Sequence, residues 1–420
     1  MGLGYVGLPL GIAFARTDCR VIGFDPDKQR VRQIKAGESY IKHIGNEEVA
    51  VIHENGGAAT ADPSKLAEAD AILICVPTPL TKHREPDMSY VHAAVETVAR
   101  FLRRGQLICL ESTTYPGTTR ELVLTRLEQT GLKGGVDFHL AYSPEREDPG
   151  VRGHTASEIP KVVGGLTARC LERALELYGH VVPRTVPVSS LEVAEAGKLM
   201  ENIFRCVNIA LVNELKVIFA RMGIDVWEVV AAASSKPFGY MPFYPGPGLG
   251  GHCIPIDPFY LTWKAREFES ISHFIELAGE INIAMPEYVV QRTVEELNRD
   301  RKSLKGSRIL LMGLAYKRDV DDTRESPSLR LMQLLLRHGA KVDYHDPHVA
   351  EFPGYEDEGL PAMRSVRLDA KRTRSYDAVI IATDHSAFDY ALLGRHAKLI
   401  IDTRNAMHRV DAAAARVAKA

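Results

Sequence analysis

Short apolar runs alternate with helical patterns over the first 190 residues of the chain. The runs lie at residues 21–24, 70–79, 105–113 and 138–144, and each ends in a turn or a polar cluster. This alternation is typical of a parallel α/β sheet, in which ligands bind at the carboxyl ends of the strands. We therefore expect Thr78, Thr113 and Glu145, which follow three of these runs, to lie near a ligand site.

The pattern becomes helical from about residue 189. A stretch rich in helix formers runs to the glycine at 223, and Ser189 with Glu192 predicts a capping box at its start. A second helical stretch, at 271–300, contains one proline, Pro286. A loop rich in Pro and Gly, at 235–258, lies between the two helices.

Strand and helix signals resume at residue 307 and continue to the last apolar run, KLIIDTRN. The predicted fold class is α/β, with two Rossmann-like doubly wound domains joined by a central helical domain. We expect a dinucleotide-binding domain at 1–187, a helical domain that carries the Pro/Gly loop at 188–300, and a second nucleotide-binding type domain at 301–420.

Charge and cysteine content narrow the class of protein. The 420 residues include 52 basic and 54 acidic side chains, for a net charge of -2. That balance argues against nucleic acid as the main partner. The six cysteines form no CxxC pair, which suits a reducing compartment. No apolar run reaches membrane-spanning length and the start does not resemble a signal peptide, so we expect a cytoplasmic protein without a membrane partner.

The first residues form a dinucleotide-binding fingerprint. Gly2, Gly4 and Gly7 make G-x-G-x-x-G before a helical stretch, and Asp25 ends the strand that follows. The glycines allow a tight turn and close approach to a pyrophosphate, and the acid suits the ribose hydroxyls of NAD but repels the extra phosphate of NADP. A strand should precede Gly2, and we expect the true start to lie upstream.

One cysteine has unusual surroundings. Residues 246–258 read GPGLGGHCIPIDP, so Cys253 follows four glycines and precedes Asp257 by four positions. A packed cysteine needs no such glycines, and His252 is the only adjacent metal-ligand type, so we expect no metal. The glycine loop favours a nucleophile with room for a substrate.

Other polar residues fall at positions that suit a site. Lys198 and Asn202 share one face of the long predicted helix, where they either form a polar stripe or hold an oxyanion. SPEREDPG at 143–150 places Glu145 and Arg146 after a strand. Lys317, Arg324 and Arg404 are either surface charges or a cationic grip on a diphosphate.

Together these stretches resemble the UDP-glucose/GDP-mannose dehydrogenase family. The motifs GLGYVGLPL, VPTP, EST, SPER, K-x-x-x-N, GPGLGGHCIPxDP and DDTRESPS occur in the family's order over essentially the whole chain. The resemblance implies an N-terminal NAD domain, a central dimerisation domain and a C-terminal domain for a UDP-sugar. It also implies oxidation of a sugar C6 alcohol to a carboxylate with two NAD, through a thiohemiacetal and a thioester on the cysteine.

The resemblance assigns roles residue by residue. The nucleophile would be Cys253. The oxyanion and alcohol contacts fall to Lys198 and Asn202, proton transfer to Asp257 and Thr113, and thioester hydrolysis to Glu145. The cofactor-binding residues would be Gly2, Gly4, Tyr5, Val6, Gly7, Asp25, Arg30, Thr78, Thr113 and Arg324. The substrate-binding residues would be Glu145, Arg146, Lys198, Asn202, Lys236, Tyr244, Gly246, Gly248, Gly250, Lys317 and Arg404.

Departures from the family pattern bear on the substrate. UDP-glucose enzymes usually carry a lysine just before the aspartate of the cysteine loop, whereas this chain has Ile256. The stretches around SPER and the cysteine loop resemble the subgroup that oxidises N-acetylated sugars. We expect UDP-N-acetylglucosamine, with UDP-N-acetylmannosamine or UDP-glucose as alternatives, in surface polysaccharide synthesis by a homodimer or higher homo-oligomer. The rivals are an alcohol dehydrogenase that stops at the aldehyde and a catalytically impaired sugar-nucleotide binding protein.

Overall fold

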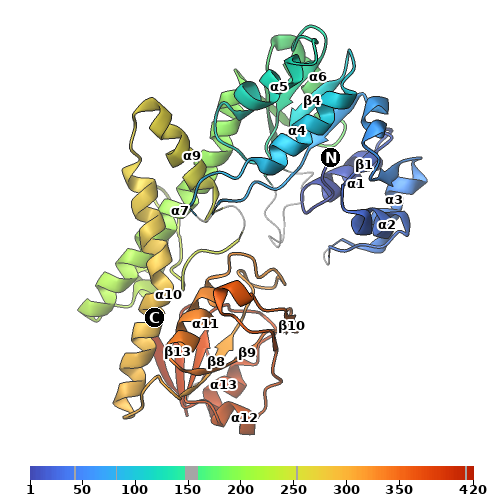
Figure 1. Cartoon of the computed structure of the whole chain (residues 1–420). Helices are drawn as coiled ribbons and strands as arrows, with labels where there is room; N and C mark the ends of the chain where they lie inside the picture. Colours follow the sequence, from blue (N-terminus) through green and yellow to red (C-terminus); the bar gives the residue numbers. More distant parts are fainter. Residues whose placement is uncertain (42–43, 82, 147–158, 252–253, 412–413) are drawn as a thin grey trace. The chain divides into compact units, whose positions relative to one another are not determined.

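The computed structural model describes residues 1–41, 44–81, 83–146, 159–251, 254–411 and 414–420. The chain divides into two compact units (Figure 1), and each is treated separately below. The first unit comprises residues 1–201 and 259–270, and the second comprises 202–258 and 271–420.

The first unit contains two sheets. Its larger sheet has the order β3-β4-β5-β6-β7, and its smaller sheet pairs β1 with β2 in parallel. The sheets are connected by backbone at the chain start: the Met1 amino group donates to the carbonyl of Leu73 at 2.8 Å, and the N–H of Gly2 donates to the carbonyl of Phe24 at 2.8 Å. The strands are β1 (Ile22–Phe24), β2 (Ala58–Thr60), β3 (Ala71–Ile74), β4 (Leu107–Leu110), β5 (His139–Tyr142), β6 (Lys161–Gly165) and β7 (Thr185–Val188).

Helices cover both faces of the larger sheet. One core places Ile72, Ile108 and Leu110 against α4 and α5, and the other places Cys109 and Val163 against α1 and α6. The helices of this region are α1 (Gly7–Ala15), α2 (Lys28–Lys35), α3 (Asn46–Glu54), η1 (Pro63–Glu68), α4 (Ser89–Phe101), η2 (Thr119–Leu124), α5 (Thr125–Glu128) and α6 (Ala168–Tyr178).

The central helices follow the predicted order. They are α7 (Leu191–Met222), α8 (Val226–Ser234), α9 (Asp257–Ala265), η4 (Arg266–Phe268) and α10 (His273–Arg299). The predicted cap at Ser189 is wrong by one residue, because the Ser190 hydroxyl accepts the N–H of Val193 at 3.3 Å. Glu192 instead forms an ion pair with Arg120 at 2.7 Å.

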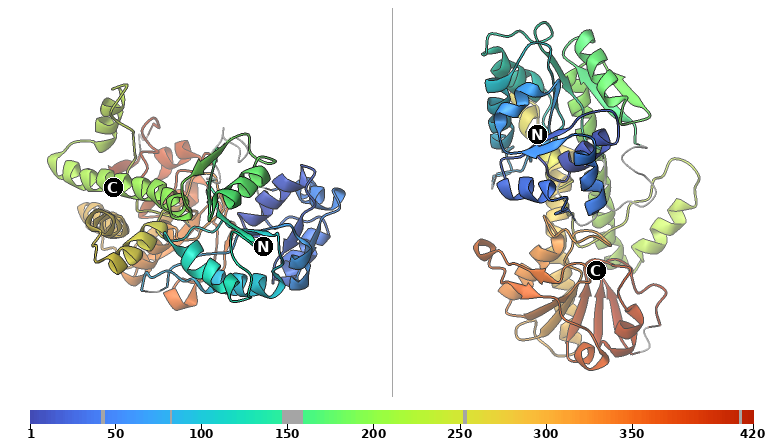
Figure 2. Two further views of the ribbon diagram at one scale, coloured as in Figure 1. Left: turned by 90° about the horizontal axis from the view of Figure 1, so that it is seen from above. Right: turned by 90° about the vertical axis from the view of Figure 1, so that its right-hand side faces the viewer.

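The C-terminal sheet is parallel throughout, in the order β14-β13-β12-β8-β9. Figure 2 shows its strands side by side. Helices α10 and α11 pack on one face and α12 and α13 lie on the other, as in a doubly wound domain. The predicted fold class is confirmed. The elements are β8 (Arg308–Met312), α11 (Pro327–Arg337), β9 (Lys341–His345), β10 (Glu351–Phe352), η5 (Glu356–Glu358), β11 (Met363–Arg364), α12 (Ala370–Arg374), β12 (Ala378–Ile381), α13 (Tyr390–His396), β13 (Leu399–Asp402) and β14 (Arg416–Lys419).

Candidate active site

The glycine fingerprint forms a tight turn before α1. Gly2 has a φ of 86°, a conformation that favours glycine. A side chain at Gly7 would collide with the carbonyl of Gly2, whereas the space around Gly4 is open. Tyr5 is exposed, and Val6 precedes the first turn of α1. The turn therefore exposes backbone at the start of a helix, as a pyrophosphate site requires.

Asp25 lies at the end of β1, beside this turn. Its carboxylate accepts the N–H groups of Leu3 at 2.8 Å and Asp27 at 2.9 Å, and Arg30 approaches it at 3.4 Å. An acidic group fixed beside the glycine turn fits the adenosine ribose of NAD. The predicted residues of the turn and Asp25 are thus brought together. Thr78 and Thr113 lie in the same unit, half-buried beyond the ends of β3 and β4, whereas Arg324 lies in the second unit and pairs with Asp322.

A buried ionic network lies at the carboxyl edge of the larger sheet. The ammonium of Lys161 is 2.7 Å from Glu111 and 3.7 Å from Glu145. The Tyr178 hydroxyl donates to Glu111 and lies 3.0 Å from the Cys109 sulfur. Burial raises the pKa of Glu111. Burial disfavours the charged form of Lys161, but Glu111 and Glu145 outweigh this effect and raise its pKa. Sequence reasoning singled out Glu145 and missed the residues that hold it.

Glu195 ties α7 to the segment that follows Thr113. Its carboxylate accepts the N–H of Gly117 at 2.6 Å, and both the N–H and the hydroxyl of Thr119, at 2.9 and 2.7 Å. Burial raises the pKa of Glu195 to about 7, although these hydrogen bonds oppose the shift. The segment that carries Thr113 is therefore anchored to the helix that carries Lys198.

Lys198 and Asn202 are both buried on α7, one turn apart. The Asn202 amide donates to the carboxylate of Asp257, the first residue of α9, and its oxygen accepts from Arg205. Asn202 and Asp257 were both predicted as site residues, and the structure brings them together. A side-chain amide held by a carboxylate is oriented for a fixed hydrogen-bonding role.

The glycine loop before Cys253 packs closely against neighbouring residues, so a side chain at Gly248 or Gly250 would be crowded. A Cβ at Gly250 would lie 2.7 Å from Tyr316 and 2.9 Å from Pro327. Gly248 has a φ of 136°, and a Cβ there would lie 3.1 Å from Pro327. Cys253 and His252 lie outside the described residues, as do residues 147–158 of the SPEREDPG stretch.

Two cations meet the loop at Gly246. Lys216 donates to its carbonyl at 2.9 Å, and a Cβ at Gly246 would lie 2.7 Å from the Arg404 guanidinium. The N–H of Gly246 donates to the side-chain oxygen of Asn213 at 3.0 Å. Arg404 itself donates to the carbonyl of Ala382 at 3.0 Å. The structure thus brings the predicted residues Gly246 and Arg404 together, and adds Lys216, which sequence reasoning missed.

The remaining predicted substrate residues are more open. Tyr244 stacks on Trp227 with ring centroids 5.7 Å apart, and Lys236 is exposed with its ammonium 5.0 Å from the ring of Phe238. Lys317 is half-buried after β8. Arg146 pairs with Glu201 at 2.6 Å.

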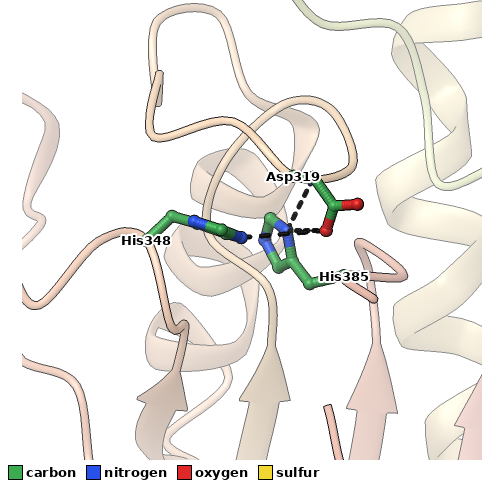
Figure 3. A group of neighbouring side chains, drawn as sticks. All are labelled: Asp319, His348 and His385. Carbon is green, nitrogen blue, oxygen red and sulfur yellow. Dashed lines mark hydrogen bonds and ion pairs between the residues drawn. The ribbon is translucent and has the colours of Figure 1, made fainter. Parts of the chain in front are cut away.

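Three potential metal ligands, Asp319, His348 and His385, cluster in the C-terminal domain (Figure 3). His385 Nδ1 accepts the N–H of Asp319 at 2.9 Å, so Nε2 carries the proton and donates to Asp346 at 3.0 Å. Both ring nitrogens are therefore in use. Despite burial, hydrogen bonds from His385 and from backbone N–H groups lower the pKa of Asp346 to about 2. Because Asp346 also accepts the N–H of Leu314 at 2.7 Å, these hydrogen bonds link His385 to the turn after β8.

A glycine turn with an acid at the neighbouring strand end, in a unit whose larger sheet is covered by helices on both faces, is typical of a dinucleotide-binding domain. The sequence matches three consecutive domains of one family: the NAD binding domain over residues 1–182, the central domain over 192–284 and the UDP binding domain over 310–409. The chain belongs to the UDP-glucose/GDP-mannose dehydrogenase family, and the resemblance found in its motifs is confirmed. It is an NAD-dependent nucleotide-sugar 6-dehydrogenase that acts on a UDP-sugar.

Individual relatives carry different sugar names. The chain is 36% identical to a UDP-N-acetyl-D-glucosamine 6-dehydrogenase from Pseudomonas aeruginosa, over 92% of this chain and 90% of that protein. It is 35% identical to a UDP-N-acetyl-D-mannosamine dehydrogenase from Pyrococcus horikoshii, over 96% and 94%. A solved UDP-D-ManNAc dehydrogenase structure from Pyrococcus horikoshii superposes with a TM-score of 0.88 at 33% identity, covering 99% of this chain and 97% of that one.

Proposed function

We propose that this protein oxidises the C6 alcohol of UDP-N-acetylglucosamine to the carboxylate in two NAD-dependent steps, for surface polysaccharide synthesis. The observation that carries the proposal is the buried hydrogen bond between Asn202 and Asp257. Asp257 follows Cys253 by four residues, so an oriented polar pair lies close in sequence to the proposed nucleophile. An enzyme that stops at the aldehyde would not need the nucleophile Cys253.

The proposed mechanism assigns each step to a residue. NAD, held at the glycine turn of Gly2 and Gly4 with its ribose at Asp25, would supply the hydride acceptor for both oxidations. The thiolate of Cys253 adds to the aldehyde to form a thiohemiacetal, and oxidation of that adduct gives a thioester. Lys198 and Asn202 donate to the oxygen on which negative charge develops. Asp257 and Thr113 orient water or accept protons, and Glu145 serves the hydrolysis of the thioester.

The nucleotide side of the substrate is assigned to the second unit. The positive charge for the diphosphate comes from Arg404, Lys317 and Lys236. Tyr244 and the glycine loop are also assigned to the substrate. The close approach of Arg404 to the glycine loop at Gly246 supports this assignment, because a guanidinium suits a phosphate. The proposed limits of the three domains remain 1–187, 188–300 and 301–420.

The choice of sugar rests on two observations. Ile256 occupies the position where UDP-glucose enzymes usually carry a lysine. The relatives that are named above act, by their names, on N-acetylated sugars. UDP-N-acetylmannosamine is the second candidate.

We also propose that the protein is a cytoplasmic homodimer that pairs through α7. Large apolar side chains recur on this helix at intervals of seven or four residues, and they are between 45% and 74% exposed. Such spacing forms a seam that a second copy of the same helix can cover. The residues are Val193, Met200, Phe204, Leu211, Ile218 and Met222. No helix within the described ranges is both long and apolar enough to cross a membrane.

The test is the yield of NADH per sugar. Purified protein with limiting UDP-N-acetylglucosamine and excess NAD should give two NADH per sugar and no free aldehyde. Cys253→Ala should abolish acid formation, because no thioester is formed. One NADH per sugar with free aldehyde in solution would contradict the mechanism, and no NADH with any UDP-sugar would contradict the proposed activity.

A further inference from the structure

The Glu145 carboxylate lies near the ammonium of Lys161, the first residue of a strand that runs antiparallel to its neighbour. Glu111 follows β4 directly and Glu145 follows β5 by three residues, so both carboxylates lie at the carboxyl edge of the sheet. Strand β6 runs antiparallel to β5, which brings its first residue, Lys161, to the same edge. One ammonium therefore meets two carboxylates that are far from it in sequence.

The two contacts of Lys161 are unequal. Its ammonium lies 2.7 Å from Glu111, whose side chain is fully buried, and 3.7 Å from Glu145, whose side chain is 22% exposed. Tyr178 donates a further hydrogen bond to Glu111. The closer pairing with Glu111 leaves Glu145 with only a partial share of the positive charge.

Glu145 also faces open space. Together with Lys161 it lines a cavity whose other walls include Pro9, Leu10 and Ala13 of α1. The Glu145 side chain is thus partly exposed, whereas the Glu111 side chain is fully buried.

Other groups near Glu145 include the N–H of Arg146, which donates to its carboxylate at 2.7 Å. Arg146 pairs with Glu201 at 2.6 Å and donates to the carbonyl of Pro160 at 2.7 Å. Cys75 is buried, and burial raises the pKa of its thiol to about 12, so it is neutral. Lys161 is a buried cation that lies 3.7 Å from Glu145.

We propose that Lys161 is a positioning residue for Glu145, and that Glu111 sets how strongly Lys161 holds that carboxylate. The proposal rests on the proposed function, in which Glu145 serves hydrolysis of the Cys253 thioester. In that step water adds to the acyl carbon, one water proton passes to Glu145, the C–S bond breaks, and sulfur leaves as a thiolate. When Glu145 accepts the proton, Lys161 keeps its closer partner, Glu111; when Glu145 releases it, the second contact is restored.

The experiment compares two variants that differ only in the cation. Glu111→Gln keeps the side-chain shape and the acceptor for Tyr178, and removes the carboxylate that competes with Glu145 for Lys161. Lys161→Met with Glu111→Gln removes the cation without leaving a buried carboxylate unpaired, which would itself threaten folding. Single-turnover reactions with UDP-N-acetylglucosamine and NAD are quenched over time, and the mass of the denatured protein reports the fraction that still carries the acyl group. The hydrolysis rate is measured from pH 5 to pH 9.

The two variants should differ in the pH at which the hydrolysis rate is half-maximal. The pH of half-maximal hydrolysis should fall in Glu111→Gln, because Lys161 then stabilises the charged form of Glu145 more strongly. In the double variant it should lie higher than in Glu111→Gln, by about one pH unit or more. Lys264→Met serves as a control, because Lys264 is an equally buried lysine of the same unit that pairs with Glu121 at 2.7 Å. It should not displace the profile.

Each outcome decides the proposal. The role of Lys161 would be overturned if the pH of half-maximal hydrolysis were equal in the two variants or lower in the double variant. The thioester mechanism would remain intact. If the wild-type protein oxidises the sugar but never carries an acyl group, the proposed function fails and the role of Lys161 falls with it. The wild-type measurement therefore separates the two failures.

Discussion

The ammonium of Lys216 on α7 donates a hydrogen bond to the carbonyl oxygen of Gly246, at 2.9 Å. Lys216 is only 5% exposed, and the charge of Arg404 lies near it. Burial, with a smaller contribution from Arg404, lowers the pKa of Lys216 from an ordinary value of 10.5 to about 7. The glycine loop is therefore supported by a lysine that loses its charge near neutral pH.

This shift predicts how stability depends on pH. Between pH 7 and pH 10 the unfolded chain keeps the Lys216 proton while the folded chain has released it, so this group makes the protein more stable as pH rises. One proton corresponds to at most about 1.4 kcal/mol per pH unit. Lys216→Met should remove this component, so urea unfolding at pH 7, 8 and 9 should show a flatter rise than in the wild type. Lys236→Met, at an exposed lysine, should keep the wild-type slope; equal slopes in all three proteins would contradict the shift.

A side chain introduced at Gly250 should disturb the loop before the cysteine. A Cβ there would lie 2.7 Å from the Cβ of Tyr316, which cannot move without its backbone. Gly250→Ala should therefore destabilise the protein by about 1–3 kcal/mol and reduce activity. Gly11→Ala is the matched control: Gly11 lies within α1 and its Cβ position is in ordinary contact with Val21 at 3.7 Å, so alanine should stabilise by about 0.5–1 kcal/mol. Thermal unfolding of the two variants distinguishes crowding from a general intolerance of alanine.

Asp25 predicts the choice of cofactor. Its buried carboxylate beside the glycine turn should repel the 2′-phosphate of NADP, so the wild type should use NAD far more efficiently. Asp25→Ala should reduce the ratio of kcat/KM for NAD to that for NADP. Asp27→Ala removes a neighbouring exposed carboxylate that caps α2, and should leave the ratio unchanged. A ratio near one in the wild type would show that Asp25 does not select the cofactor.

The sequence predicted β1, β3, β4 and β5 from their short apolar runs. Segments 105–113 and 138–144 contain β4 and β5, in which every residue is buried. Strands β6 and β7 were missed, because the first begins with Lys161 and ends in two glycines, and the second contains Pro187. Lysine, glycine and proline are weak strand signals.

The same limit applies to the site. Gly2, Asp25 and Asn202 could be singled out because their spacing follows one turn, one strand or one helix. Lys161 could not, because it meets Glu111, 50 residues away, only through the antiparallel pairing of β5 and β6. Lys216 was missed for a similar reason: a lysine on a long helix is usually solvated, and its burial depends on where the Gly246 loop returns.

The apolar seam on α7 predicts the oligomeric state. Phe204 lies within it and is 47% exposed. Phe204→Glu should convert the protein from dimer to monomer, because it would place a negative charge in the seam of both subunits. Tyr90→Glu, at a 49% exposed aromatic on α4, should leave the dimer intact. Molar mass by light scattering after size exclusion decides between them, and a wild-type monomer at micromolar concentration would refute the proposed seam.

Substrate choice is the sharpest prediction. A site built to hydrogen-bond an acetamido group leaves buried polar groups unpaired when the sugar is plain glucose, at a cost of about 1–3 kcal/mol each. One such loss reduces the rate by roughly ten- to a hundredfold, so kcat/KM for UDP-N-acetylglucosamine should exceed that for UDP-glucose by at least that factor. Ile256→Lys, which introduces the residue usual in UDP-glucose enzymes, should narrow the gap. The variant also serves as the control for position 256, because an unchanged ratio would show that Ile256 takes no part in selection. Equal kcat/KM values for the two sugars in the wild type would contradict the N-acetyl assignment. A preference for UDP-N-acetylmannosamine would identify that sugar as the substrate in place of UDP-N-acetylglucosamine.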